Sequence, residues 1–376
     1  MLDKPNNKLK SDKKFFGGKN MKQGRTLESF ATELLRRKSN SQDYLVNTAG
    51  IEMDADENGA SLSWYDANNN NYLYGVNDIA HYQIAQATGI PVKYYQKMLD
   101  SNPALLSENV NAWFQTEPKV RMLRTLDGSA RAFLSDRYRR IDNYDLAEVV
   151  LPILNDMNVS FMSSEVTDTR MYIKVVNERL QKDVRPGDYV QSGLIISNSE
   201  VGMGTVTIQP LLYRLVCTNG MIVNDAHNTT RRRHVGRGNL ADDNYVLYAS
   251  DTLLADDQAL MLKIRDTIKA SLDEVHFGNL IEAMKTAAET QIETSHIPEM
   301  IQLASSEFGY TKKEGEGILD YLIRGGDLTL YGLSNAITRY AQDVTSYDRS
   351  QELESIGYDV MTMPGKTWRN LNKAEF

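Results

Sequence analysis

Strand-like and helical patterns are segregated along this chain, and that segregation constrains its fold more than any other feature. Short apolar runs separated by turn residues fill the middle third of the sequence. From about Asp251 onward, apolar residues recur at helical spacing, as in the stripe of Leu260, Ile264 and Ile268. Strands followed by helices, instead of alternating with them, are typical of α+β proteins. We therefore predict an α+β fold with a central antiparallel sheet of β-hairpins, flanking helices and a helical C-terminal portion.

Changes in composition and pattern divide the chain into four regions. Residues 1–25 are rich in Lys, Asn and Gly and poor in apolar side chains, which predicts a disordered basic arm. Residues 26–118 are predicted to form a mixed, mainly helical N-terminal region. Residues 119–245 are predicted to form an antiparallel β-rich core region, and residues 246–376 a helical C-terminal region.

Charge is distributed unevenly between the arm and the rest of the chain. The first 25 residues carry eight basic and two acidic side chains, a net charge of +6; the whole chain carries −8, so the remainder carries −14. An acidic body argues against indiscriminate coating of a duplex, where neutralisation of phosphates dominates affinity. A local basic groove is compatible with that total. For the arm, a solvated tail is the simpler interpretation and a nucleic-acid-binding arm is the alternative.

No apolar run reaches the roughly 18 residues that a membrane-spanning helix needs. The arm also has no apolar stretch of the kind found in a signal peptide. Cys217 is the single cysteine of the sequence, which excludes an internal disulfide and a cysteine-based zinc cluster. We therefore expect a cytoplasmic protein without a membrane partner.

The dipeptide Asp127-Gly128 is a strong signal for a two-residue hairpin turn. Regular pairing around that turn sets Arg124 opposite Arg131. It also sets Met122 opposite Phe133, and the period of two then places all four side chains on one face. Like charges opposed across a ladder are destabilising unless an anion or an acidic side chain lies between them. The hairpin is therefore predicted to present an open face of arginines and aromatic rings.

Basic side chains continue beyond the hairpin, interleaved with a tyrosine. Guanidinium groups that alternate with aromatic rings suit single-stranded nucleic acid, because the cations meet phosphates and the rings stack on bases. The alternative is that these arginines pair with Asp and Glu of the acidic helical half, and the sequence leaves both interpretations open. The predicted nucleic-acid-binding residues of this segment are Arg124, Arg131, Phe133, Arg137, Tyr138, Arg139 and Arg140.

A second basic cluster lies about ninety residues downstream, in a stretch rich in Asn, Thr and Gly. Three adjacent arginines cannot all be buried and paired without a large desolvation cost, so we expect them on a surface loop or a sheet edge. Contact with a phosphate backbone is the sharper interpretation, and a solvated loop is the alternative. The residues concerned are Arg231, Arg232, Arg233, His234 and Arg237.

Motifs that would indicate catalysis do not stand out. The five histidines lack metal-ligand spacing, and Gly202-Met203-Gly204 lacks the further residues of a phosphate-binding loop. No nucleophile elbow, kinase signature or catalytic carboxylate pair is visible. We therefore expect a non-enzymatic protein more than an enzyme, with no catalytic residues, no metal and no cofactor.

Four segments of the sequence carry a family resemblance: residues 89–95 with 111–113, residues 131–143, residues 214–220 followed by Arg233-His234, and residues 330–338. Together they resemble a phage- and plasmid-borne family catalogued as domain of unknown function 932. The resemblance runs from about residue 27 to the C-terminus and leaves the lysine-rich arm outside. It implies a mobile-element protein, in the host cytoplasm if it is phage-encoded, and such proteins serve replication, recombination or evasion of host defence.

The leading hypothesis is a non-enzymatic homo-oligomer that binds the phosphate backbone of single-stranded DNA in annealing, recombination or replication. A hairpin face of arginines and rings backed by a helix is a fold-level analogy to single-strand annealing proteins. The first alternative is an anti-defence or inhibitor protein whose acidic surface docks on a host or phage protein. The second is a metal-dependent nuclease assembled from scattered carboxylates.

Overall fold

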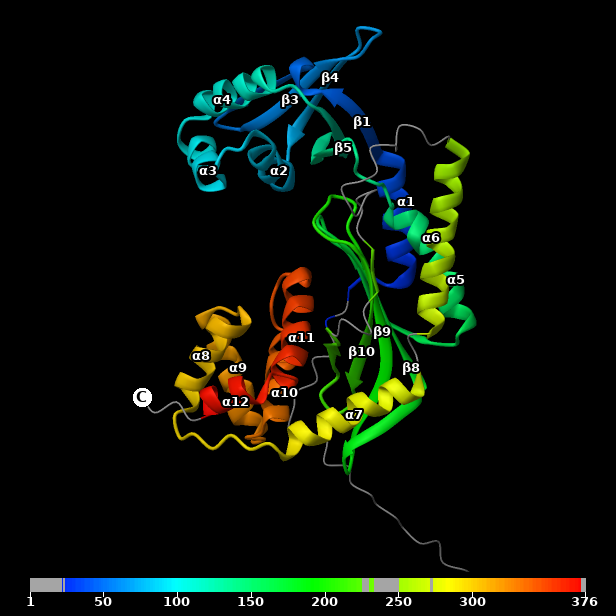
Figure 1. The fold of residues 1–376 in the computed structure, drawn as a ribbon, viewed down its shortest axis with the longest axis vertical. Helices are drawn as coiled ribbons and strands as arrows, with labels where there is room; N and C mark the ends of the chain where they lie inside the picture. Colours follow the sequence, from blue (N-terminus) through cyan, green and yellow to red (C-terminus); the bar gives the residue numbers. More distant parts are fainter. Residues whose placement is uncertain (1–21, 23, 225–229, 233–249, 271–272, 373–376) are drawn as a thin grey trace, which may run out of the picture.

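The computed structural model describes residues 22, 24–224, 230–232, 250–270 and 273–372. Within them, helices and strands form two sheets with separate helical layers, so the predicted α+β class is confirmed. Figure 1 shows the N-terminal sheet at the top of the molecule, the second sheet below it, and the C-terminal helices beside the lower part of the second sheet. Most of the predicted basic arm lies outside the described residues.

The N-terminal sheet has six strands in the order β1-β5-β6-β4-β3-β2. Its neighbours pair antiparallel except β4 and β6, which are parallel. Two of its strands come from beyond residue 118, so the predicted hairpin completes this sheet. The strands are β1 (Ser41–Asn47), β2 (Ile51–Asp56), β3 (Gly59–Tyr65), β4 (Asn71–Val76), β5 (Val120–Leu126) and β6 (Ser129–Ser135), with a 3-10 turn, η1 (Thr48–Gly50), between β1 and β2.

Three helices cover one face of the N-terminal sheet: α2 (Asp78–Thr88), α3 (Val92–Ser101) and α4 (Pro103–Thr116). Asn77 caps α2 by accepting a hydrogen bond from the backbone of Ala80, as its position before the apolar residues predicts. Gly89 ends the same helix in a left-handed conformation with φ of 72°. These local signals fix where the helices begin and end.

The second sheet is an antiparallel meander in the order β11-β10-β9-β8-β7. Its central strands β8 and β9 span 15 and 11 residues. β12 pairs with the start of β10, and β11 pairs with the end of β10. The strands are β7 (Ser160–Val166), β8 (Met171–Arg185), β9 (Asp188–Asn198), β10 (Val206–Arg214), β11 (Asn219–Ile222) and β12 (Thr230–Arg232).

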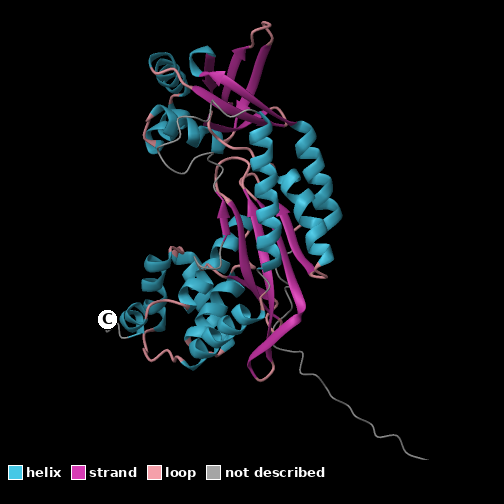
Figure 2. Cartoon of the chain, turned by 45° about the vertical axis from the view of Figure 1, so that its right-hand side comes forward, coloured by secondary structure: helices cyan, strands magenta, loops and turns pink. Residues whose placement is uncertain are grey.

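The two faces of the second sheet are covered by different helices (Figure 2). One face packs under α1 (Leu27–Asn40), α5 (Asn143–Asp156) and α6 (Ser250–Ala270), with an apolar core between them. The C-terminal helical portion, as predicted, supplies the rest of the cover. Its helices are α7 (Glu274–Glu289), α8 (Ile297–Phe308), α9 (Lys312–Gly325), α10 (Leu330–Tyr340), α11 (Tyr347–Met361) and α12 (Gly365–Asn372).

The first described residues are docked on the second sheet and the C-terminal helices. The backbone of Arg25 pairs with Ser164 of β7. The backbone N–H of Lys22 donates to the side chain of Gln342 at 2.6 Å. The Lys22 ammonium donates to the carbonyl groups of Val344 and Thr345, between α10 and α11. Lys22 and Arg25, at the end of the predicted arm, therefore contact the folded part of the chain.

The predicted hairpin forms, but its predicted register is wrong beyond the turn. Asp127-Gly128 makes the turn, with both residues at positive φ. A β-bulge then shifts the pairing between Arg124 and Thr125. Arg124 consequently lies opposite Ala132 and not opposite Arg131, which is the extra residue of the bulge. Past a bulge, the alternation of faces counted from the turn no longer holds.

The bulge also changes which side chains the hairpin buries. Phe133 lies opposite Leu123, not opposite Met122 as predicted. Its ring is buried in the core between the N-terminal sheet and its helices. Met122 and Leu134 pack on the other face against Val201, from the loop between β9 and β10. Both faces of the hairpin are therefore covered, and the predicted open face is wrong.

Candidate functional site

Arg124 and Arg131 are buried in a network of ion pairs between the two sheets. Arg124 is 1% exposed, and its guanidinium donates to Asp43 at 2.8 Å and to Asp142 at 2.5 Å. Arg131 is 6% exposed and pairs with Glu200 at 2.7 Å. Burial lowers the pKa of Arg124, but the carboxylates of Asp142 and Asp43 outweigh burial, and the net shift is upward. These acidic partners lie outside the helical C-terminal half that the alternative interpretation named.

Residues 199–205, which join β9 to β10 and are called the junction loop here, are held by this network. The Glu200 carbonyl accepts from Arg124 at 2.9 Å, and its carboxylate accepts from the backbone N–H of Asn143, at the start of α5, at 2.6 Å. The Val201 carbonyl accepts from Gln83 of α2 at 2.7 Å. Buried charged hydrogen bonds of this kind fix geometry tightly. The junction loop therefore connects the second sheet to the N-terminal sheet.

The other predicted residues of the first basic segment lie on the linker between β6 and α5. Tyr138 is half-buried, and its hydroxyl donates to the Ser199 carbonyl of the junction loop at 3.0 Å. Arg137 and Arg140 are exposed, and Arg139 is half-buried. Arg140 lies 3.3 Å from the Asp43 carboxylate, at the outer edge of the buried network.

The second basic segment begins at the same end of the second sheet. In β12, Arg231 pairs with Thr207 and Arg232 pairs with Val206, the first residues of β10 after the junction loop. The backbone thus brings these two arginines next to the end of the junction loop, and the linker that carries Arg137 contacts the start of the same loop at Ser199. Arg233, His234 and Arg237 lie outside the described residues.

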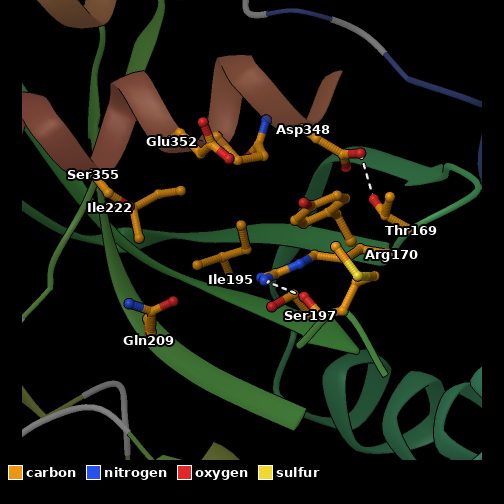
Figure 3. Close-up of a pocket in the computed structure, with 12 residues that line it drawn as sticks. Thr169, Arg170, Ile195, Ser197, Gln209, Ile222, Asp348, Glu352 and Ser355 are labelled. Carbon is orange, nitrogen blue, oxygen red and sulfur yellow. Dashed lines mark hydrogen bonds between the residues drawn. The ribbon is translucent and has the colours of Figure 1, made fainter. Parts of the chain in front are cut away.

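A cavity of about 290 Å³ lies between the second sheet and α11, beside the junction loop (Figure 3). Side chains of the strands, including Ile195 and Ile222, form an apolar wall, and polar side chains of α11 form the opposite wall. The cavity reaches the junction loop at Met203. It is lined by Thr169, Arg170, Tyr172, Ile195, Ser197, Met203, Gln209, Ile222, Asp348, Gln351, Glu352 and Ser355.

The polar wall follows from the spacing of four residues on α11. Asp348, Gln351, Glu352 and Ser355 stand at positions i, i+3, i+4 and i+7, which share one face of a helix. Polar residues at this spacing ordinarily mark a face turned to solvent. Here the stripe is turned toward a sheet, and the cavity lies between them.

Hydroxyl groups orient the carboxylate at one end of the stripe. Thr169 donates to Asp348 at 2.5 Å and Thr167 donates to it at 3.1 Å. Burial and then the nearby Asp348 carboxylate raise the pKa of Tyr172, whose hydroxyl therefore stays protonated as a donor. The Asp348 carboxylate is thus fixed in place and presents acceptors at the cavity.

At the junction loop, the cavity is bordered by a cation. The Arg170 guanidinium donates to the Met203 carbonyl at 2.8 Å. A Cβ atom on Gly204 would lie 2.8 Å from the Arg170 Cζ, so glycine at this position lets the guanidinium lie against the loop. The cavity therefore offers a cation at the loop and carboxylates along α11.

Within the polar stripe of α11, the burial of the Gln351 amide is not explained by a gain in stability. Its side chain is 5% exposed, and neither its amide oxygen nor its amide nitrogen has a hydrogen-bond partner among the described residues. A buried amide left unpaired costs about 1–3 kcal/mol. Gln351 therefore contributes a buried, unused donor and a buried, unused acceptor to the wall of the cavity.

A buried ion pair holds α11 against the sheet next to the cavity. Lys174 of β8 and Glu354 of α11 are 1% and 0% exposed at their side chains and lie 2.5 Å apart. Gln342 donates to the same carboxylate at 3.0 Å. Burial lowers the pKa of Lys174, against the opposing effect of Glu354. The pair fixes the separation between the two walls of the cavity.

Comparison with known families gives one match. Residues 132–368 match the family described as "Domain of unknown function (DUF932)", which is more than half of the chain. The protein belongs to this family. The resemblance read from the sequence is confirmed over that range. No curated protein and no solved structure gives a significant match.

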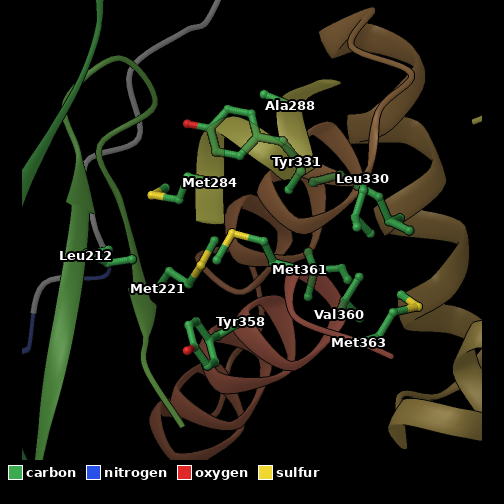
Figure 4. Packing of buried hydrophobic residues seen from close by; sticks show 14 of the residues in the cluster. Leu212, Met221, Met284, Ala288, Leu330, Tyr331, Tyr358, Val360, Met361 and Met363 are labelled. Atoms are coloured by element: carbon green, nitrogen blue, oxygen red, sulfur yellow. The ribbon is translucent and has the colours of Figure 1, made fainter. Parts of the chain in front are cut away.

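The DUF932 match contains every residue that lines the cavity and all of the helices that support α11. Figure 4 shows the core behind α11, where methionines of β11, α7 and α11 meet. Met361 and Val360 of α11 pack there with Met221 and Met284. Unbranched methionine side chains fill irregular space between helices. The cavity wall therefore rests on a continuous core.

Two absences concern the alternatives drawn from the sequence. In the described part of the chain, no group of three or more His, Cys, Asp or Glu side chains could hold a metal ion. Within the same residues, no helix has both the length and the apolar character needed to cross a membrane.

Proposed function

We propose that this protein binds single-stranded nucleic acid at the end of the second sheet where the linker, β12 and the cavity meet the junction loop. The observation that carries the proposal is the unpaired Gln351 amide in the wall of a cavity that reaches the junction loop, together with the two arginine-bearing segments that adjoin the two ends of that loop. Guanidinium groups favour phosphates, and a polar cavity with one apolar wall favours an unstacked base. Single-stranded nucleic acid is a ligand that offers both phosphates and unstacked bases.

The buried arginines take a supporting role in this proposal. Arg124, Arg131 and Phe133 cannot reach a strand because they are buried, but the two arginines hold the junction loop that lies between the binding segments. The phosphate contacts are assigned instead to the linker and β12. These residues are Arg137, Arg139, Arg140, Arg231 and Arg232.

The cavity would select bases that carry an amino group. The carboxylates of Asp348 and Glu352 accept hydrogen bonds from amino groups, and the Gln351 amide can pair with a donor and an acceptor on one base edge. Arg170, at the junction-loop side of the cavity, supplies a cation for the adjoining phosphate. Adenine, cytosine and guanine carry amino groups, and thymine does not.

Fluorescence anisotropy with labelled oligonucleotides, in about 50 to 200 mM salt, tests the phosphate contacts. Replacing Arg137 and Arg140 by Ala is expected to weaken binding at least about tenfold and to reduce the slope of log K against log salt by about 0.7 per lost contact. A matched control removes two cations elsewhere, through Lys285→Ala with Arg324→Ala. Equal losses in both variants, or no binding by the unmodified protein at low salt, would refute the proposal.

The base contact is tested separately with homopolymers. Gln351→Leu is expected to weaken binding of oligo(dA), oligo(dC) and oligo(dT) alike, because each of these bases offers a donor and an acceptor on its Watson–Crick edge. Gln302→Leu, an exposed glutamine on α8, is the matched control. Equal affinity of the Gln351 variant and the unmodified protein for all three polymers would remove the cavity from the binding site.

We extend the proposal to annealing by a homo-oligomer, which the sequence also favours. Energy transfer between complementary labelled strands, measured with and without the protein, reports annealing directly. Binding without faster annealing would limit the function to strand protection.

A further inference from the structure

A second, smaller cavity of about 130 Å³ lies where the turn between β10 and β11 meets α9 and α10. Arg214 and Cys217 line it from the sheet side. Asn335 and Arg339 line it from α10, one helical turn apart. The volume is a few times the roughly 30 Å³ that one water molecule occupies in the liquid. The cavity is therefore sized for a group of a few heavy atoms.

Arg339 is a buried cation without a counter-charge. The residue is 8% exposed, and its guanidinium has no carboxylate within ion-pair distance among the described residues. Its Nη1 atom is buried and has no acceptor in that part of the chain. The guanidinium lies over the ring of Tyr321, with the ring centroid 5.3 Å from the Arg339 Cζ, and the hydroxyl of that ring donates to Asp343 at 2.5 Å. An unpaired buried charge is costly, so the site favours an anion.

The other charged groups at this cavity are already neutralised. Arg214 donates to both oxygens of Asp188 at 2.6 Å. Asp327, which also lines the cavity, pairs with Arg185 at 2.9 Å. Among the described residues that line the cavity, the uncompensated charge is therefore the positive charge of Arg339.

Asn335 adds a second unused donor. Its amide nitrogen is buried without an acceptor in the described residues, and it lies on the same face of α10 as Arg339. A ligand that satisfies both groups must offer acceptors and a negative charge. Oxyanions have these properties, and neutral donors do not.

We propose that the cavity between α9, α10 and the β10–β11 turn is a binding site for a small oxyanion, a phosphate or carboxylate group, held by Arg339 and Asn335. This site is separate from the nucleic-acid surface of the proposed function. It does not share lining residues with the α11 cavity.

Cys217 provides a reporter for the site, because it lines the cavity and is the one cysteine of the chain. Inorganic phosphate is expected to slow the reaction of Cys217 with N-ethylmaleimide and to raise the Tm of the full-length protein with the logarithm of its concentration. Sodium chloride at equal ionic strength controls for screening, and sodium acetate at equal ionic strength distinguishes a carboxylate ligand from phosphate.

Arg339→Met is expected to abolish both effects of phosphate. In buffer without phosphate, its Tm is expected to equal or exceed that of the unmodified protein, because the variant removes an unpaired buried charge. Asn335→Leu keeps the positive charge of Arg339 and is expected to weaken phosphate binding several-fold. This variant tests the proposal if Arg339→Met does not fold. Arg324→Met, at an exposed arginine of α9, is the matched control.

The proposal is overturned if neither phosphate nor acetate protects Cys217 or raises the Tm. It is also overturned if both site variants respond to these anions as the unmodified protein does. Neither result depends on whether the protein binds nucleic acid.

Discussion

The two faces of the second sheet are covered by helices in different ways. Under α1, α5 and α6, buried side chains such as Ile173 and Ile196 meet other apolar groups. Under α11, the same strands meet a polar helix face, a cavity and the buried pair of Lys174 and Glu354. The apolar face contributes to stability through packing, whereas the face under α11 keeps unpaired polar groups that cost stability. The comparison can be tested by substitutions on both sides of the sheet.

The largest expected effect comes from separating the buried ion pair. Glu354→Ala leaves the Lys174 ammonium buried without a partner, and we expect the free energy of unfolding to fall by about 3–5 kcal/mol. Urea denaturation measures the change. The double variant Lys174→Met with Glu354→Leu is expected to regain most of the loss, because apolar pairs often replace buried ion pairs at little cost. A single variant that loses less than about 1 kcal/mol would contradict the assignment of a tightly coupled pair.

We expect acid to lower the stability of the α11 side of the protein by protonating the Glu314 carboxylate. Hydrogen bonds from Arg349 of α11 lower the pKa of this carboxyl from 4.5 to about 2 in the folded protein. Because the folded-state pKa lies below the unfolded one, the contribution is complete above pH 4.5 and is lost as the pH falls toward 2. We expect a loss of about 3 kcal/mol over that window.

The urea midpoint as a function of pH provides the measurement, with Glu314→Gln for comparison. The variant should lose stability at neutral pH and show a weaker dependence on acid. Glu33 of α1 has a folded-state pKa lowered to about 2 by Arg36 and Arg37, so part of the dependence remains. An unchanged pH profile in Glu314→Gln would show that the ion pair with Arg349 contributes nothing.

Ile195 and Ile196 are neighbours on β9, so the same substitution, Ile to Val, can be compared on the two faces of the sheet. Ile196 is buried under the apolar layer, and Ile195 borders the cavity under α11. Ile196→Val is expected to cost about 1 kcal/mol. Ile195→Val should cost about 0.5 kcal/mol, because Ile195 packs on apolar neighbours but also borders the cavity. Thermal unfolding of both variants measures which substitution costs more stability. A larger loss for Ile195→Val would show that the cavity wall is the more tightly packed face.

The smallest expected change is that of Gln351→Met. This side chain makes no hydrogen bond in the described structure, so its replacement should change the free energy of unfolding by less than about 0.5 kcal/mol, or increase it. Gln342→Met is the matched variant, since its amide donates to Thr338 and Glu354 and accepts from Lys22. That variant should lose about 1–3 kcal/mol. Equal losses would mean that Gln351 has a structural role.

Local patterns in the sequence predict the element types well. The turn at Asp127-Gly128 and the apolar stripe of α6 both appear in the structure where they were expected. Each depends on residues that are neighbours in the chain. The α+β class follows from their order.

Tertiary partners explain what the sequence could not predict. Arg124 bonds to Asp43 and Glu200, which are 81 and 76 residues away. Nothing near the hairpin indicates these carboxylates or the bulge that aims Arg124 toward them. The stripe of α11 is visible in the sequence, but its polar residues predict a solvent-facing side until the sheet beneath them is known.

The docking of Lys22 has a consequence for how the chain folds. Its bond to Gln342 joins residues 320 positions apart. Closing so long a loop costs entropy that a few hydrogen bonds do not offset until the segments between are already packed. During synthesis, Lys22 is made long before its partners at Gln342, Val344 and Thr345. Lys22 must therefore wait until α10 and α11 are in place, and its contact with them forms late in folding.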